Sequence, residues 1–176
     1  MRVILLFGLL SVFNCWGASE PFTDGPLISG FGKHATVQQD LLLDKDMVFK
    51  VVFDVGSTGE PKTLNKRFDT LARFLNMHVA NGIAPEHIQL ALVIHGKASF
   101  DVLNNLAYQK KYGVDNPNHD LLQALLKHKV RILLCGQSAA YQQVQNVDVV
   151  KGVQMALSAM TAHAVLAREG YSLNPF

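Results

Sequence analysis

Apolar residues along the chain follow two alternating patterns. Short, nearly continuous apolar runs have the length and composition of strands buried on both faces. These runs are residues 47–55, 88–94, 130–134 and 153–157. Other stretches carry apolar residues at helical spacing, which predicts amphipathic helices. These stretches are residues 64–80, 100–108, 120–129, 139–144 and 158–168. Strands that alternate with helices predict an α/β fold made of βαβ units, with a mostly parallel sheet.

The first residues have a pattern of their own. Arg2 supplies a positive charge, residues 3–13 are nearly all apolar, and small residues follow at positions 17–19. This is the layout of a secretory signal peptide over residues 1–19. The apolar run is too short to span a bilayer, which takes about 20 residues. The sequence therefore predicts export to the periplasm or the cell exterior, with no membrane attachment after cleavage.

Removal of the predicted signal peptide leaves an arm and one domain. Prolines and glycines interrupt residues 20–45, which predicts an irregular N-terminal arm, and residues 46–176 form the predicted α/β domain. The loss of Arg2 takes the formal charge at pH 7 from +2 to +1. A chain so close to neutral is not expected to capture nucleic acid or an anionic membrane.

Cleavage also leaves Cys135 as the sole cysteine, because Cys15 lies in the predicted signal peptide. No disulfide can then form within the chain. An odd thiol in an exported protein pairs with another chain, reacts, or lies inert in the core.

Two predicted strands end in a residue that can carry chemistry. His95-Gly96 follows the second strand and Cys135-Gly136 follows the third. In a parallel sheet both pairs lie at the carboxyl edge, where ligand crevices form. We therefore expect Cys135 to be the reactive residue and His95 to be its candidate proton partner.

The turn after the cysteine consists of Gly136, Gln137 and Ser138. Its backbone amides are expected to face the thiolate or a bound anion, which would lower the thiol pKa. With Gly96, these three residues are candidate ligand-binding positions. In the alternative interpretation, Cys135 is a small buried hydrophobic residue and His95 caps its loop.

A polar loop supplies further candidates. Asn116 and Asn118 bracket a proline, and Tyr108 precedes them in the chain. The loop either caps a helix or folds over the cysteine edge as a pocket wall. The seven histidines match no metal-ligand spacing, and residues 56–59 (GSTG) lack the spacing of a phosphate loop. We therefore expect no metal and no cofactor.

The last predicted helix, residues 158–168, is apolar on nearly all sides. Such a helix either packs within the core or lies at a subunit interface.

Several separated segments carry a resemblance to a known family. They are residues 92–98 (LVIHGKA), 116–118 (NPN), 134–139 (LCGQSA), 157–163 (LSAMTAH) and 170–176 (GYSLNPF). Over residues 48–176 the chain resembles the exported branch of the DsrE/DsrF-like family. The resemblance implies a central, mostly parallel sheet of about four or five strands with helices on both faces. It also implies homo-oligomers, such as trimers or hexamers.

In the sulfur-relay members of that family, a cysteine matching Cys135 accepts sulfane sulfur as a persulfide and passes it on. The resemblance therefore implies a carrier or binder of small sulfur species, sulfurtransferase-like at most, that exchanges sulfur with a donor or acceptor protein. The chain departs from the relay members in its Gly-Gln-Ser continuation and in its predicted compartment. The alternative is a non-catalytic, oligomeric module that binds a small ligand, with Cys135 in the pocket wall.

Overall fold

The computed structural model describes residues 21–174, so the predicted signal peptide lies outside the described residues. Within this range five strands form one wholly parallel sheet in the order β4-β3-β2-β1-β5. The strands are β1 (Phe49–Val55), β2 (Ile88–Ile94), β3 (Arg131–Cys135), β4 (Gln154–Ala156) and β5 (Ser172–Asn174). The α/β fold predicted from the sequence is confirmed.

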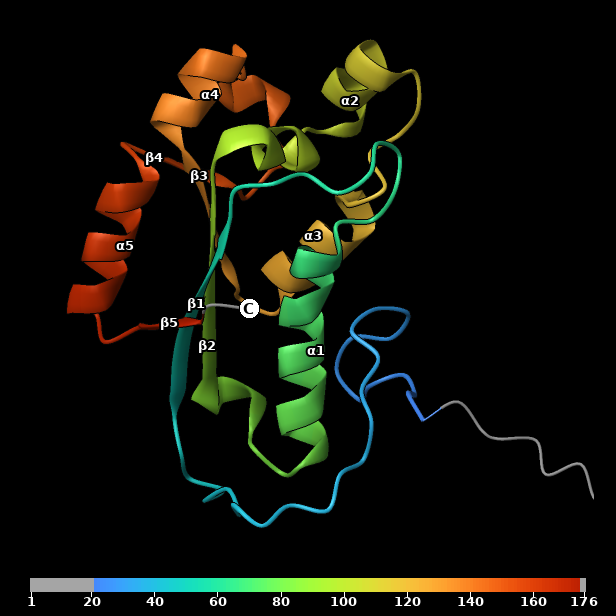
Figure 1. Ribbon diagram of the computed structural model, residues 1–176, viewed down its shortest axis with the longest axis vertical. Coiled ribbons are helices and arrows are strands. Elements are labelled where there is room, and N and C mark those ends of the chain that lie inside the picture. The colour runs from blue at the N-terminus through green and yellow to red at the C-terminus, as the bar shows by residue number, and fades with distance from the viewer. Residues whose placement is uncertain (1–20, 175–176) are drawn as a thin grey trace, which may run out of the picture.

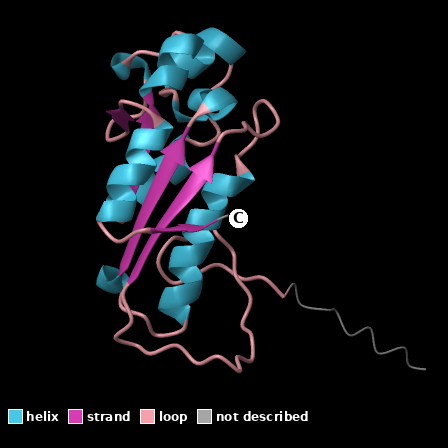
Figure 2. Ribbon diagram, turned by 60° about the vertical axis from the view of Figure 1, so that its left-hand side comes forward, coloured by secondary structure: helices cyan, strands magenta, loops and turns pink. Residues whose placement is uncertain are grey.

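Helices cover both faces of the sheet (Figures 1 and 2). The α-helices are α1 (Lys66–Ala80), α2 (Asn105–Tyr112), α3 (His119–Lys127), α4 (Gly136–Gln142) and α5 (Ala159–Arg168). Short 3₁₀ helices are η1 (Pro85–His87), η2 (Gly96–Val102) and η3 (Asn146–Asp148). In Figure 1, α1 and α3 lie on one side of the sheet and α5 lies on the other, while α2 and α4 stand beyond the carboxyl ends of the central strands.

The two faces of the sheet bury very different amounts of apolar surface. On the α1 and α3 side, a large core holds alternate residues of β1, β2 and β3, such as Leu90, Leu92 and Ile94 of β2. On the other side, a small cluster holds only Val52, Ala91, Val93, Leu133, Ala162 and Leu166 as buried members. Because successive side chains on a strand point to opposite faces, these two sets follow from the strand pleat. The α5 side is thus the thinner layer.

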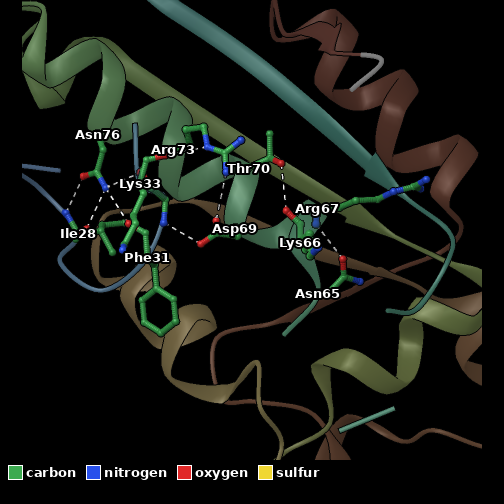
Figure 3. Close-up of polar contacts among 11 residues, drawn as sticks. Ile28, Phe31, Lys33, Asn65, Lys66, Arg67, Asp69, Thr70, Arg73 and Asn76 are labelled. Atoms are coloured by element: carbon green, nitrogen blue, oxygen red, sulfur yellow. Dashed lines mark hydrogen bonds and ion pairs between the residues drawn. The ribbon is translucent and has the colours of Figure 1, made fainter. Parts of the chain in front are cut away.

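The N-terminal arm is irregular, but it is firmly attached to α1 (Figure 3). Asn76 is fully buried, and its amide accepts from the Ile28 N–H at 2.8 Å and donates to the carbonyls of Ile28 and Phe31 at 2.8 and 2.9 Å. The Gly32 N–H donates to Asp69 at 2.7 Å. The arm pairs with itself through an antiparallel bridge between Thr23 and His34, and α1 supplies partners for the backbone groups between them.

Several predicted boundaries move because side chains cap helices. Helix α1 begins after Asn65, whose side chain accepts from the Arg67 N–H, and not after Thr63. The predicted helix over residues 100–108 is divided, since η2 ends at Val102 and Asn104 caps a new helix, α2. Helix α4 begins immediately after Cys135, three residues before the predicted start. Strand β5 contains no apolar run, so the sequence did not predict it.

Candidate functional site

Asp54, His95 and Cys135 lie at the carboxyl ends of β1, β2 and β3. His95 and Cys135 are the pair that follows the last aligned residues of β2 and β3, and Asp54 is aligned with Val93. Val93 and Leu133 point into the small α5-side cluster. Since side chains alternate along a strand, His95 and Cys135, two positions further on, project to this same side. The sheet therefore places a carboxylate, an imidazole and a thiol in one row beneath α5.

Cys135 is surrounded by hydrogen-bond donors. Its side chain is the N-cap of α4, and its Sγ accepts from the Ser138 N–H at 3.5 Å. Burial by itself raises the pKa of the Cys135 thiol. The Ser138 hydroxyl and the backbone amides of Ser138, Ala159 and Gln137 lower it more, so the net pKa lies below the ordinary value for cysteine. The residue is only 6% exposed, so its thiolate is stabilised by these fixed donors and not by bulk water.

Ser138 joins the ends of β2 and β3. Its Oγ accepts from the Gly96 N–H at 2.9 Å, and its hydroxyl also bonds the Cys135 sulfur. A serine hydroxyl has one hydrogen to donate. With the oxygen accepting from Gly96, that hydrogen is available for the Cys135 sulfur. The Gly96 N–H thus holds the serine hydroxyl that lowers the pKa of the thiol.

A second cluster lies on the same edge. The Asp54 carboxylate binds two imidazoles, with Oδ2 at 3.0 Å from Nε2 of His95 and Oδ1 at 2.7 Å from Nε2 of His163. Burial raises the pKa of Asp54, but the hydrogen bonds and charge of His163 and His95 lower it more, so its net pKa is below the ordinary value. The side chains are 37%, 38% and 26% exposed for Asp54, His95 and His163. The Asp54 carboxylate therefore stays ionised at neutral pH, and the Asp54–His95–His163 cluster faces solvent.

A model of the DsrE/DsrF-like family matches residues 47–175. The chain belongs to the DsrE/DsrF-like family. No curated protein matches the chain. A solved structure of a protein of unknown function, MTH1491 from Methanobacterium thermoautotrophicum, is similar with a TM-score of 0.51 and 16% identity, covering 72% of this chain and 97% of that one. The ychN protein from E. coli is similar with a TM-score of 0.48 and 14% identity, covering 72% and 100% of the two chains.

The structure brings most of the predicted site residues of this DsrE/DsrF-like chain together. Cys135, Gly136, Gln137 and Ser138 form the turn into α4, and Gly96 bonds Ser138 across the strands. The Gln137 side chain donates to the Leu157 carbonyl at 3.3 Å, away from the thiol. Gly136 packs so closely on β4 that a Cβ there would lie 2.6 Å from the Ala156 oxygen.

The ring of His95 points toward Asp54 on β1, not toward the thiol on β3. Nε2 of His95 is bound to the Asp54 carboxylate, and among residues 21–174 no hydrogen bond joins this ring to the Cys135 sulfur. The role of His95 as proton partner therefore stays a prediction.

Asn116, Asn118 and Tyr108 use their polar atoms within the fold. Asn116 donates to the backbone carbonyls of Asp101 and Leu103, at 2.9 and 2.6 Å. Asn118 accepts from the Asn65 N–H at 2.7 Å, and the Tyr108 hydroxyl accepts from the Lys62 N–H at 3.4 Å. These contacts bind the loops around α1, η2 and α3 to one another. These contacts favour a structural role for the loop, although the Asn118 side chain makes no cap hydrogen bond to α3, and a ligand role stays a prediction.

Sequence reasoning missed Asp54 and His163. Asp54 lies inside an apolar run, and His163 was assigned as an ordinary polar position on the last helix. The signal available was the carboxylate itself, since a charged residue in a strand buried on both faces needs a partner. The partner lies 109 residues away in sequence, so no local pattern reveals it.

Three further features of the described residues concern metal binding, membrane crossing and ligand grooves. Among residues 21–174, no three His, Cys, Asp or Glu side chains are grouped so that they could hold a metal ion. In the same range, no helix has both the length and the apolar character to cross a bilayer. A groove of about 940 Å³ lies between α2 and α4, and its lining includes Leu106, Lys110 and Val147 but not Cys135.

Proposed function

We propose that this DsrE/DsrF-like protein carries or binds sulfane sulfur on Cys135 as a persulfide. The observation that supports this proposal best is the Ser138 N–H that donates to Sγ at 3.5 Å, together with the Ser138 hydroxyl and the Gln137 and Ala159 amides, which also lower the thiol pKa. These groups stabilise a thiolate, which is the nucleophilic form of cysteine. They also suit the anionic outer sulfur of a persulfide.

The transfer step needs no outside oxidant when the donor already contains sulfane sulfur. The Cys135 thiolate attacks the outer sulfur of thiosulfate, a new S–S bond forms, and the bond to the sulfite sulfur breaks. The electron pair leaves with sulfite, so the cysteine becomes a persulfide anion. In the release step, an acceptor thiolate attacks the outer sulfur and Cys135 leaves as its thiolate. Persulfide or polysulfide donors react in the same way.

We further propose that the protein works outside the cytoplasm, in the periplasm or after secretion, and as a homo-oligomer. The signal-peptide pattern of residues 1–19 supports export. Exposed apolar side chains on and beside α5 support assembly, because Leu157, Met160 and Val165 are 72%, 80% and 45% exposed in the single chain. In that chain α5 buries only Ala162 and Leu166, so it is not a core helix.

Mass spectrometry of the protein without its signal peptide tests the carrier function. After incubation with thiosulfate or polysulfide, we expect Cys135 to gain the mass of one sulfur atom, and a reductant to remove it. The Cys135→Ser variant is the control and should gain nothing. A folded wild-type protein that gains no sulfur from either donor would refute the proposal.

The alternative is a ligand-binding module in which Cys135 is structural, and the low exposure of this residue supports it. Titration with a thiol reagent separates the two functions. Reaction of the native protein at neutral pH supports the carrier, whereas a thiol that reacts only after denaturation supports the structural interpretation.

A further inference from the structure

Helix α5 contacts the candidate site at two points. Strand β4 aligns Ala156 with Cys135, α5 begins three residues later at Ala159, and the Ala159 backbone amide is one of the groups that lower the pKa of the Cys135 thiol. His163 binds Asp54 at 2.7 Å. Residues four apart lie on the same face of a helix, one turn from each other. The helix therefore passes over β2 and connects the thiol on β3 with the carboxylate on β1.

Besides its connection to β4, whose Ala156 is aligned with Cys135, this half of α5 has few buried contacts. Only Ala162 and Leu166 of the helix are buried, and Ala159 is partly buried against them. The ion pair between Arg131 and Glu169 holds the helix at its far end. At the end nearest the thiol, residues 21–174 show one hydrogen bond between a side chain of the helix and the sheet, which joins His163 to Asp54.

The Asp54 carboxylate is itself fixed in place. Its second oxygen binds His95 at 3.0 Å, so both oxygens have partners. The His95 ring lies against Gly56, where a Cβ would come within 2.4 Å of Cε1. The carboxylate can therefore hold His163 at a set position above the sheet.

We propose that Asp54 and His163 are positioning residues, which hold the first turn of α5 so that the Ala159 amide reaches the Cys135 sulfur. The proposal rests on Cys135 being the reacting group of the proposed function. Neither Asp54 nor His163 takes part in bond making. They act on the thiol through the placement of a helix.

The sign of one substitution separates this role from a simple charge effect. A carboxylate near a thiol disfavours the thiolate, so if charge alone mattered, Asp54→Asn would lower the thiol pKa. If Asp54 positions α5, the same substitution weakens the Ala159 hydrogen bond and raises the thiol pKa. The two effects oppose each other, and the proposal requires the positioning effect to be the larger one, so that the thiol pKa rises.

The experiment is the pH dependence of Cys135 alkylation by iodoacetamide. For Asp54→Asn we expect the rate at pH 7 to fall roughly threefold to tenfold, while the limiting rate at high pH is kept. His163→Asn and His163→Gln form a matched pair, because both carry an amide N–H but only glutamine has the reach of histidine. We expect His163→Asn to behave like Asp54→Asn and His163→Gln to stay within about twofold of wild type.

Amide hydrogen exchange supplies a second measurement and keeps the test valid if Asp54→Asn does not fold. The Ala159 amide should exchange faster in His163→Asn than in His163→Gln. An unchanged or lowered thiol pKa in Asp54→Asn, or equal behaviour of the two His163 variants, would overturn the proposal. Failure of the proposed function is seen separately, because a wild-type protein that takes up no sulfur can still show these shifts in alkylation.

Discussion

The imidazole of His95 fills the space that a side chain at position 56 would occupy. A Cβ added to Gly56 would lie 2.4 Å from Cε1 and 2.8 Å from Nε2 of His95. Real Cβ atoms do not approach other atoms so closely, so the ring and the glycine depend on each other. The glycine after β1 is thus part of the Asp54–His95–His163 cluster, although it carries no functional group.

We expect Gly56→Ala to displace the His95 ring, break its bond to Asp54 and lower the free energy of unfolding by about 1–3 kcal/mol. Urea unfolding measures this loss. Gly59→Ala in the same turn is the control, since its Cβ would meet Asn65 Cα at an ordinary 3.5 Å. Equal stability of the two variants would show that the ring moves aside without cost.

Ser138→Ala should affect both the thiol and the fold. Loss of the hydroxyl removes a donor to Cys135 and leaves the Gly96 N–H without its acceptor. We expect a raised thiol pKa, read from the pH dependence of alkylation, and a loss of about 1–3 kcal/mol in unfolding. Ser99→Ala is the control, because its hydroxyl bonds the Gly96 carbonyl at 2.8 Å and not the thiol. A Ser138→Ala thiol that titrates like wild type would contradict the role of the hydroxyl.

Two aspartates should give opposite pH dependences of stability. Burial raises the pKa of Asp101, against hydrogen bonds from Thr58, Asn65 and the Gly59 backbone. The folded state then binds the proton more tightly, so the contribution of Asp101 is fully present below the unfolded pKa of 3.8 and is lost as pH rises toward the folded value.

Asp54 should show the reverse, since its folded pKa is lowered. Its contribution is present above the unfolded pKa of 3.8 and is lost as pH falls toward the folded value. Urea unfolding of wild type, Asp54→Asn and Asp101→Asn between pH 3 and 7 gives both differences. As pH rises, the wild-type advantage over Asp54→Asn should grow and that over Asp101→Asn should shrink. Parallel curves for the two variants would contradict at least one of these directions.

Asn76→Ala should release the N-terminal arm. The buried amide binds backbone groups of Leu27, Ile28, Phe31 and Gly32, and we expect its loss to cost roughly 2–4 kcal/mol. Limited proteolysis should then cut the arm before the domain. Thr70→Ala is the control on the same helix, because this exposed hydroxyl bonds only Lys66. An arm that resists protease in Asn76→Ala would show that apolar packing alone retains it.

The sequence predicts well those strands whose apolar residues bury them in the middle of the sheet. β1, β2 and β3 are mostly buried, and the apolar run of each strand is sufficient to locate it in the sequence. Strand β5 is largely exposed and has only Leu173 as an apolar residue, so it is a strand only because β1 offers it backbone partners. A strand defined by its neighbour leaves no local signal.

The same distinction applies to the site. Cys135 and His95 could be found because each ends an apolar run next to a glycine. Asp54 and His163 could not be paired from sequence, because their contact depends on how α5 lies across the sheet. Asn116 and Asn118 look like ligand-binding residues in sequence, since polar side chains that bind backbone loops have the same composition as those that bind ligands.

The order of strands in the sheet has a consequence for how the chain is made. β1 is the first strand along the described chain, and it pairs with β2 on one side and β5, the last, on the other. Residues 51–53 therefore keep an open edge until residues 172–174 have been synthesised. An open parallel edge is a place where another chain can pair. A nascent or truncated chain that stops before Ser172 thus exposes a central strand of the finished protein to aggregation.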